Sequence, residues 1–219
     1  CGACLPRFGG GACFERMALL STERNIKPVQ DRAQIVHTLA RAFQDDPALS
    51  WILPDAAQRK IRLPRMFDFI VPLDLRDGFA LGSADGEAAT LWRSPGKPHT
   101  GLLDMVMMLP AVFHTFGTAA LRGLDVSEAM DAHHPKGITY FYLHYAGVLP
   151  EHQGKGWGGA AIRAGLDKAD AAGIPALLET ATERNVGLYT SLGFEILSEW
   201  DVPKGGPHFW TMMRRVPTA

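Results

Sequence analysis

A short glycine-rich stretch decides the fold of this chain: Val148-Leu149-Pro150-Glu151-His152-Gln153-Gly154-Lys155-Gly156-Trp157-Gly158-Gly159. Before it, the aromatic and β-branched segment from Ile138 to Leu149 predicts a long buried strand. After it, apolar residues recur at helical spacing from Ala160 to Ala172, which predicts a helix. Four glycines within six residues make a turn entropically costly to order. Such a cost is expected where a ligand must approach the backbone closely. This order of strand, glycine-rich turn and helix therefore predicts an anion site at the helix N-terminus.

The glycines alone do not identify the anion. Gly154-x-Gly156-x-x-Gly159 satisfies the dinucleotide pattern G-x-G-x-x-G, and Glu179 follows at the distance where an acidic residue is expected. However, Pro150 to Gln153 separates the strand from the first glycine, and the remaining chain is too short for a six-stranded dinucleotide-binding sheet. A nicotinamide-dependent oxidoreductase is therefore a disfavoured alternative. A P-loop is excluded, because no G-K-[ST] follows the required gap.

The rest of the chain predicts a mixed α/β sheet, of the α+β kind. In the second predicted helix, which Pro64 would kink, we expect Ile61, Leu63, Phe67 and Ile70 to face inward. Strands that alternate with helices and end in hairpins are typical of such a sheet. The predicted strands are Leu20 to Ile26, Phe79 to Ser83, Ala88 to Arg93, Ala176 to Thr180, Phe194 to Trp200 and His208 to Met213. The predicted helices include a first one that ends at Asp45-Asp46-Pro47, followed by Pro54 to Val71, Gly101 to Phe116, Ala119 to Met130 and Val186 to Leu192.

The composition of the chain argues against several classes of binding partner. Of 219 residues, 22 are Lys or Arg and 23 are Asp or Glu, so the formal net charge is −1, which argues against a nucleic-acid partner. No window reaches the roughly 18 apolar residues of a membrane span, so we expect no membrane partner. A homodimer is compatible with the sequence. The eight histidines show no metal-binding spacing, and we expect no metal.

All three cysteines, Cys1, Cys4 and Cys13, lie at the beginning of the chain. Three thiolates without a second close pair do not make a structural zinc site. A chain body without cysteine is typical of a cytoplasmic protein. We expect residues 1–16 to be an N-terminal extension that is disordered or derived from upstream sequence, since Met17 is a natural start, and residues 17–219 to form a single domain.

Two motifs carry a resemblance to a known family. The V-x-P followed by Gln153-x-x-Gly156-x-Gly158 resembles the coenzyme A signature of the GNAT superfamily of N-acetyltransferases, and Asn185-x-x-x-Tyr189-x-x-x-Gly193-Phe194 resembles a later motif of that superfamily. Within it, residues from about 20 to 216 are similar to the puromycin N-acetyltransferase group, most specifically over 138–213. The resemblance implies a central, mostly antiparallel sheet flanked by helices, with acetyl-CoA as the acetyl donor.

The resemblance also implies a set of coenzyme-binding residues. The strand end would pair its backbone with the pantetheine arm, and a main-chain N–H near Val148 would stabilise the oxyanion of the tetrahedral intermediate. Tyr189 would contact the coenzyme and, as a phenol with a pKa near ~10, protonate the departing thiolate as general acid. Asn185 would hydrogen-bond the coenzyme. The full set of residues is Ala146, Gly147, Val148, Gln153, Gly154, Lys155, Gly156, Trp157, Gly158, Gly159, Asn185 and Tyr189.

Direct attack by an amine requires a general base, which the motifs do not name. Glu179, at the end of its predicted strand, is our catalytic candidate for direct or water-mediated proton removal; its alternative role is to pair with Arg184. His144 would serve if it faces inward, although a buried hydrogen-bonded histidine is the more usual finding. The other candidates, His133, His134 and His208, could equally be surface residues.

The acceptor is expected to be a small, partly apolar primary amine. Aromatic residues of the first half are candidates for an apolar pocket: Trp51, Phe67, Phe69, Trp92, Phe113 and Phe116. Asp45 and Asp46 are the acidic residues near them, too few for a polycationic substrate. A non-catalytic acyl-CoA binding or sensing module is the alternative function; Tyr189 argues against it, since a sensor needs no proton donor to sulfur.

Overall fold

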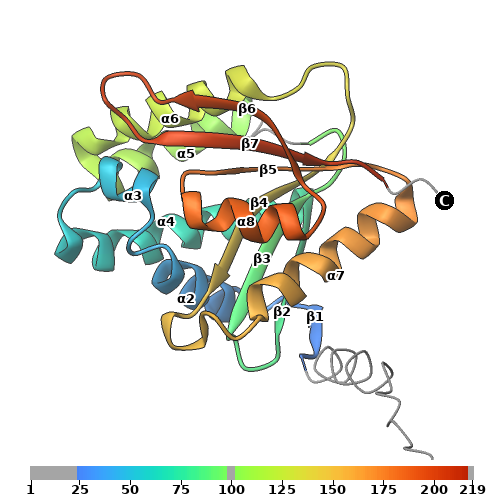
Figure 1. The fold of residues 1–219 in the computed structure, drawn as a ribbon. Helices are drawn as coiled ribbons and strands as arrows, with labels where there is room; N and C mark the ends of the chain where they lie inside the picture. Colours follow the sequence, from blue (N-terminus) through green and yellow to red (C-terminus); the bar gives the residue numbers. More distant parts are fainter. Residues whose placement is uncertain (1–23, 98–101, 217–219) are drawn as a thin grey trace, which may run out of the picture.

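The computed structural model describes residues 24–97 and 102–216, so the expectations for the cysteines and for residues 1–16 lie outside the described residues. The described strands form one seven-stranded sheet in the order β1-β2-β3-β4-β5-β7-β6 (Figure 1). Every neighbouring pair is antiparallel except β4 and β5, which are parallel. The strands are β1 (Ile26–Pro28), β2 (Gly78–Ser83), β3 (Ala88–Arg93), β4 (Phe141–Val148), β5 (Ala176–Thr180), β6 (Glu195–Asp201) and β7 (His208–Arg214).

Helices cover both faces of the sheet, which confirms the mostly antiparallel sheet flanked by helices. Figure 1 views the sheet from the side of α7 and α8. The α-helices are α2 (Arg32–Ala42), α3 (Pro47–Ile52), α4 (Ala56–Asp77), α5 (Leu102–Phe116), α6 (Ala120–His133), α7 (Trp157–Ala172) and α8 (Glu183–Ser191), with 3-10 turns at η1 (Gly117–Ala119) and η2 (Pro150–His152). In the described chain, no helix has both the length and the apolar character needed to cross a bilayer.

Two hydrophobic clusters lie on opposite faces of the sheet, as the period-2 alternation of strands requires. On β3, Leu91 packs in the cluster that contains Leu39 of α2 and Phe67 of α4. Its neighbour Trp92 packs in the other cluster, with residues of α7 such as Ile162. A Cβ at Gly165 would overlap the Trp92 ring, so the glycine lets α7 lie directly on the sheet.

The parallel strands β4 and β5 separate along their length. They are in register only at Phe141–Ala176, Tyr142–Leu177 and Leu143–Leu178. Beyond these pairs, β5 continues against β7, and β4 continues against β3 as far as Val148. The strand edges that face each other across this gap therefore have backbone groups to offer a ligand.

A β-bulge lies where the two strands separate. Leu91 of β3 stands opposite Tyr145, and Trp92 opposite Leu143, so His144 is the extra residue of β4. A bulge redirects the side chains beside it and is frequent next to functional sites. It is a feature of register that the sequence pattern does not show.

The predicted elements after the glycine-rich stretch match the structure within a few residues, but the first half needs three corrections. Asp46-Pro47, predicted only to end a helix, also begins α3: the Asp46 side chain accepts a hydrogen bond from the Leu49 N–H at 3.0 Å, and Pro47 occupies the first turn. The prediction that Ile61 faces inward was wrong, because 52% of it is exposed. Helix α4 also runs six residues past its predicted end at Val71.

Candidate active site

A cavity of about 360 Å³ lies where β4 and β5 separate. Its apolar wall comes from α3, α4, α5 and α6, on the face of the sheet opposite α7. Its other wall is formed by the diverging ends of β4 and β5 and by α8. Five residues considered in the sequence analysis for coenzyme binding or catalysis line this one cavity: His144, Ala146, Glu179, Asn185 and Tyr189.

Tyr189 and Asn185 line the cavity from α8. They lie one turn apart on the same helix face, so both reach the cavity. Tyr189 is buried and packs edge-on against Phe194, with the ring centroids 6.0 Å apart. Burial, with a further effect of the nearby Asp46 carboxylate, raises the pKa of Tyr189 to about 12. The phenol therefore stays protonated at neutral pH, as a proton donor must.

The glycine-rich loop ends at the N-terminus of α7. Gly154 and Gly156 have positive φ angles of 72° and 82°, which L side chains adopt only with strain. Gly156 is the N-cap of α7, and no side chain caps the helix there. The amide groups of the first turn and the helix dipole are thus available to an anion.

Basic side chains surround this helix end. The Arg24 guanidinium lies over the Trp157 ring, 5.9 Å from its centroid, and next to Gly156. Arg163 lies against Gly159, and Lys155 is exposed in the loop. The loop and these cations fit the diphosphate of a coenzyme. Arg24 and Arg163 were missed by sequence reasoning; for Arg163 the helical i+4 spacing from Gly159 was the available signal.

Two of the predicted coenzyme residues have structural roles of their own. The Gln153 side-chain amide donates to the Val148 carbonyl at 3.2 Å and so closes the turn after β4. A Cβ at Gly147 would come within 2.9 Å of Leu39 and Ala42, so the glycine there is required by the packing of α2. Gly147 can therefore contact a ligand only through its backbone groups.

Glu179 is held inside a polar network. Its side chain has no exposed surface; the Tyr142 hydroxyl donates to Oε2 at 2.7 Å, and Nε2 of His134 lies 2.7 Å from Oε1. His134 in turn contacts the Tyr140 hydroxyl through Nδ1 at 3.0 Å. Burial and the Glu179 charge raise the pKa of Tyr142 far above its ordinary value. The sequence left open whether His134 lies at the surface; the structure buries it, with 6% exposed.

His144 belongs to a second buried polar group. Its Nδ1 lies 2.7 Å from Oδ2 of Asp74 on α4, and the Arg93 Nε donates to Oδ1 of the same carboxylate at 2.7 Å. The Asp74 side chain is fully buried, whereas 16% of the His144 side chain is exposed, on the cavity wall. His144 therefore both faces the cavity and is hydrogen-bonded, which joins two roles that the sequence analysis had set apart.

Comparison with known proteins agrees with this geometry. The model of the acetyltransferase (GNAT) family matches residues 116–194, which include the gap between β4 and β5, the glycine-rich loop and α8. An uncharacterized N-acetyltransferase of Schizosaccharomyces pombe is 26% identical over 176 residues, covering 75% of this chain and 71% of that protein. Over residues 116–194 this chain is thus similar to the GNAT family of acetyltransferases.

Solved structures of GNAT proteins share the fold. The crystal structure of "histone acetyltransferase HPA2 and related acetyltransferase" from Corynebacterium glutamicum has a TM-score of 0.66 and 24% identity, covering 90% of this chain and 98% of that one. Arylalkylamine N-acetyltransferase 2 from Aedes aegypti has a TM-score of 0.61 and 14% identity, covering 88% and 99%. The enzyme described here is therefore an acetyl-CoA-dependent acetyltransferase with the GNAT fold.

In this enzyme the apolar wall of the cavity differs in part from the expected set of aromatic residues. Phe69 and Phe116 line the cavity, but Phe67 and Trp92 are fully buried in the two core clusters, and Phe113 is exposed. Asp46 lines the cavity as well. Within the described chain, no group of three His, Cys, Asp or Glu residues could hold a metal ion.

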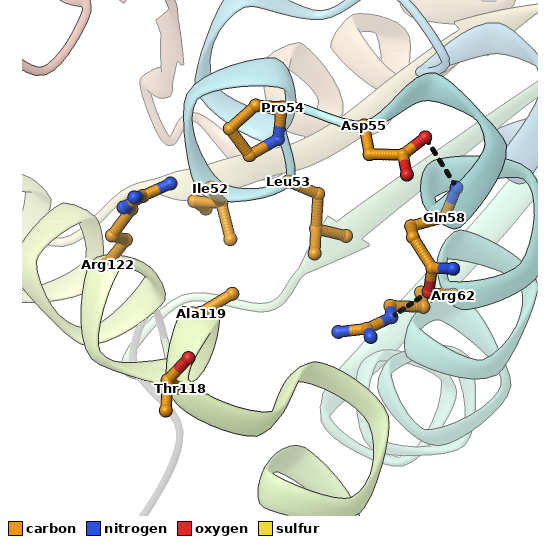
Figure 2. Close-up of a pocket in the computed structure, with 9 residues that line it drawn as sticks. All are labelled: Ile52, Leu53, Pro54, Asp55, Gln58, Arg62, Thr118, Ala119 and Arg122. Carbon is orange, nitrogen blue, oxygen red and sulfur yellow. Dashed lines mark hydrogen bonds between the residues drawn. The ribbon is translucent and has the colours of Figure 1, made fainter.

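Figure 2 shows a second pocket of the enzyme, between the start of α4 and the η1–α6 region. Its volume is about 190 Å³, smaller than that of the main cavity. Ile52 and Ala119 line both this pocket and the main cavity. Its two arginines hold neighbouring segments together: Arg62 donates to the Phe116 carbonyl and Arg122 to the Trp51 carbonyl, each at 3.0 Å.

Proposed function

We propose that the enzyme transfers the acetyl group of acetyl-CoA to the primary amine of a small, largely apolar molecule. The observation that carries this proposal is the cavity itself, whose apolar wall leads directly to the gap between β4 and β5. An amine bound there would have its apolar part against residues such as Phe69 and Phe116 and its nitrogen toward the strand ends. A cavity of about 360 Å³ suits a small molecule.

The charges of the cavity favour an amine over an acid. Of the described residues that line it, Asp46 and Glu179 are acidic, and none is Lys or Arg. Asp46 is the acidic group on the acceptor side of the cavity. Its single negative charge can compensate one ammonium group of a bound amine but not several. This supports a monoamine and argues against a polyamine.

The two substrates would occupy opposite ends of the gap. We assign the diphosphate of the coenzyme to the Gly154–Gly159 loop, with Arg24, Lys155 and Arg163 beside it. The backbone of Ala146 to Val148 would bind the pantetheine arm, and Asn185 would hydrogen-bond it. Acetyl-CoA supplies an acetyl thioester with a thiolate leaving group. Tyr189 would give its phenolic proton to that sulfur.

Release of free thiol in the presence of an amine tests the proposal. A panel should include arylalkylamines, alkylamines, amino acids and polyamines, with thermal stabilisation by acetyl-CoA measured in parallel. We expect the highest kcat/KM for apolar monoamines and at least tenfold lower values for polyamines and amino acids. Stabilisation by acetyl-CoA without thiol release from any amine would contradict the proposal and favour the sensing module. A preference for polyamines would refute the acceptor assignment alone.

A further inference from the structure

We propose that His144 is the general base of this acetyltransferase and that Asp74, held by Arg93, is its positioning residue. The proposal rests on the amine-acetylating function above and deepens it, because the sequence motifs name an acid but no base. Glu179 was the first candidate by position in the sequence. The contacts of the two side chains favour His144.

The first argument is access. The Glu179 side chain has no exposed surface, and its two oxygens face Tyr142 and His134. What Glu179 presents to the cavity is its backbone, since the residue as a whole is partly exposed while its side chain is not. His144 presents its ring instead. A base must reach the proton it removes, directly or through one water.

The second argument is the tautomer that the contacts select. Burial alone would raise the pKa of Asp74, but His144 and Arg93 outweigh it and hold that pKa below its ordinary value. An ionised carboxylate only accepts hydrogen bonds, so Nδ1 of His144 must carry the proton in their 2.7 Å contact. In neutral imidazole, Nε2 then keeps its lone pair and can accept a proton.

The third argument is the charge state of His144. Burial lowers its pKa below 6.5, against the opposing effect of Asp74. The titratable groups that face it are Asp74 of α4, Arg93 of β3, Glu179 of β5, and its β4 neighbours Tyr142 and Tyr145. Both tyrosines have raised pKa values and are therefore neutral. The charged groups that face His144 are then two carboxylates and one guanidinium, and Arg93 compensates the charge of one carboxylate. The imidazole is thus neutral, and basic, at pH 7.

The proposed step balances as follows. The neutral form of the acceptor amine attacks: its nitrogen forms a bond to the acetyl carbon and gives one proton to Nε2 of His144. The C–S bond breaks with its electron pair on sulfur, and Tyr189 donates one proton to that sulfur. The products are the N-acetylated amine and the free thiol. Solvent returns the proton from the imidazolium to the phenolate, which resets the enzyme. The base lies on β4 and the acid on α8, so the proton of the attacking nitrogen and the proton for the departing sulfur are handled by different residues.

Substitution of His144 by Asn is the sharpest test. The Asn amide can still donate to Asp74 from the place of Nδ1, but it has no atom in the place of Nε2. We expect kcat to fall by ~10²–10⁴-fold, with the affinity for coenzyme A and the melting temperature close to wild type. Exogenous imidazole should partly restore His144→Ala. His208→Gln, a change of an exposed histidine outside the cavity, is the control and should keep full activity.

The pH profile separates the two candidate bases. An aromatic amine that is neutral across the pH range should be used, so that the acidic limb of kcat/KM reports the enzyme. In wild type, we expect activity to be lost as pH falls through a value below 6.5. Asp74→Asn should lower kcat and displace this limb, because Asn no longer fixes the tautomer. Glu179→Gln should leave the limb in place.

Several results would overturn the assignment. They are a wild-type profile with no acidic limb, a His144→Asn variant within twofold of wild-type kcat, or a limb that disappears in Glu179→Gln. Each would leave the proposed function intact as long as wild type releases thiol with amines. The wild-type profile decides the question even where a variant fails to fold.

Discussion

Leu143 of β4 and Leu178 of β5 form the last pair in register between these two parallel strands. The next residue of each strand is one of the two candidate bases, His144 and Glu179. His144 is set in a bulge and reaches the cavity, whereas Glu179 continues in regular pairing with β7 and its side chain remains buried. The point where the strands separate thus both opens the cavity and determines which side chain can serve it.

Replacement of Tyr189 by Phe tests the proton donor. The ring and its contact with Phe194 are kept, and only the hydroxyl is lost. We expect kcat to fall on the order of 10²-fold with little change in coenzyme affinity, since a proton is donated only as the thiolate departs. Because the pKa of Tyr189 is about 12, wild type should lose this donor only near that pH. Steady-state and binding measurements compare the two; an unchanged kcat would assign the donor to water or another group.

Gly156→Val tests the diphosphate site. A valine there would have to adopt a φ of 82°, and its Cβ would lie 3.1 Å from Nη1 of Arg24. Gly173→Val is the matched control, because Gly173 ends the same helix with a φ of 66° and open space around it. Both variants should lose about 1–2 kcal/mol of stability. Only Gly156→Val should lose thermal stabilisation by acetyl-CoA, and equal stabilisation in both would refute the assignment of the loop.

Gly123→Phe tests the acceptor cavity. Gly123 lines the cavity from α6, and a Cβ there would meet nothing within 4 Å, so a larger side chain can fill the space without displacing the core. We expect KM for the amine to rise at least tenfold, with KM for acetyl-CoA unchanged. Gly123→Ala is the control: it should gain about 1 kcal/mol from helix propensity and keep wild-type kinetics. Unchanged amine kinetics in the Phe variant would place the acceptor elsewhere.

The sequence predicted the elements around the proposed donor site but not the arrangement of the acceptor cavity. The strand, glycine-rich turn and helix from 138 to 172 are contiguous, so their local signals specify how they lie relative to one another. The hydrogen bond between Asp74 and His144 joins residues 70 positions apart, on a helix and in a bulge. No periodic pattern encodes that contact, because both the bulge and the register of β4 depend on tertiary packing.

Burial of polar residues was the other feature that local patterns did not reveal. His134 and Tyr140 follow the end of α6, a position typical of exposed residues, yet both are buried: His134 contacts the Glu179 carboxylate, and the Tyr140 hydroxyl contacts His134. Ile61 was assigned inward from helical spacing and is exposed, because α4 contacts the sheet and α2 along a different stripe. Helical period indicates that one face is buried, but tertiary contacts select which of several apolar stripes it is.

Asp46→Asn tests the acidic group of the acceptor cavity. Burial raises the pKa of Asp46, against the lowering effect of the Leu49 and Ala48 N–H groups at the start of α3. A carboxyl whose folded-state pKa is raised stabilises the fold when protonated, and that stability is lost as pH rises through the folded-state pKa. Asn keeps the N-cap without the buried charge. At pH 7 the variant should therefore be more stable, by about 1 kcal/mol or about 2–4 °C in Tm.

The same variant should bind amines less well, because a negative charge that would attract the ammonium form of the acceptor is gone. It should also lower the pKa of Tyr189, since the Asp46 charge contributes to raising it. The measurements are thermal unfolding from pH 7 downward and KM for a protonated amine against a neutral aromatic one. The stability gap should close as pH falls, and KM should rise only for the protonated amine. A variant less stable than wild type at pH 7, or an equal rise in KM for both amines, would show that Asp46 acts through the helix cap and not through its charge.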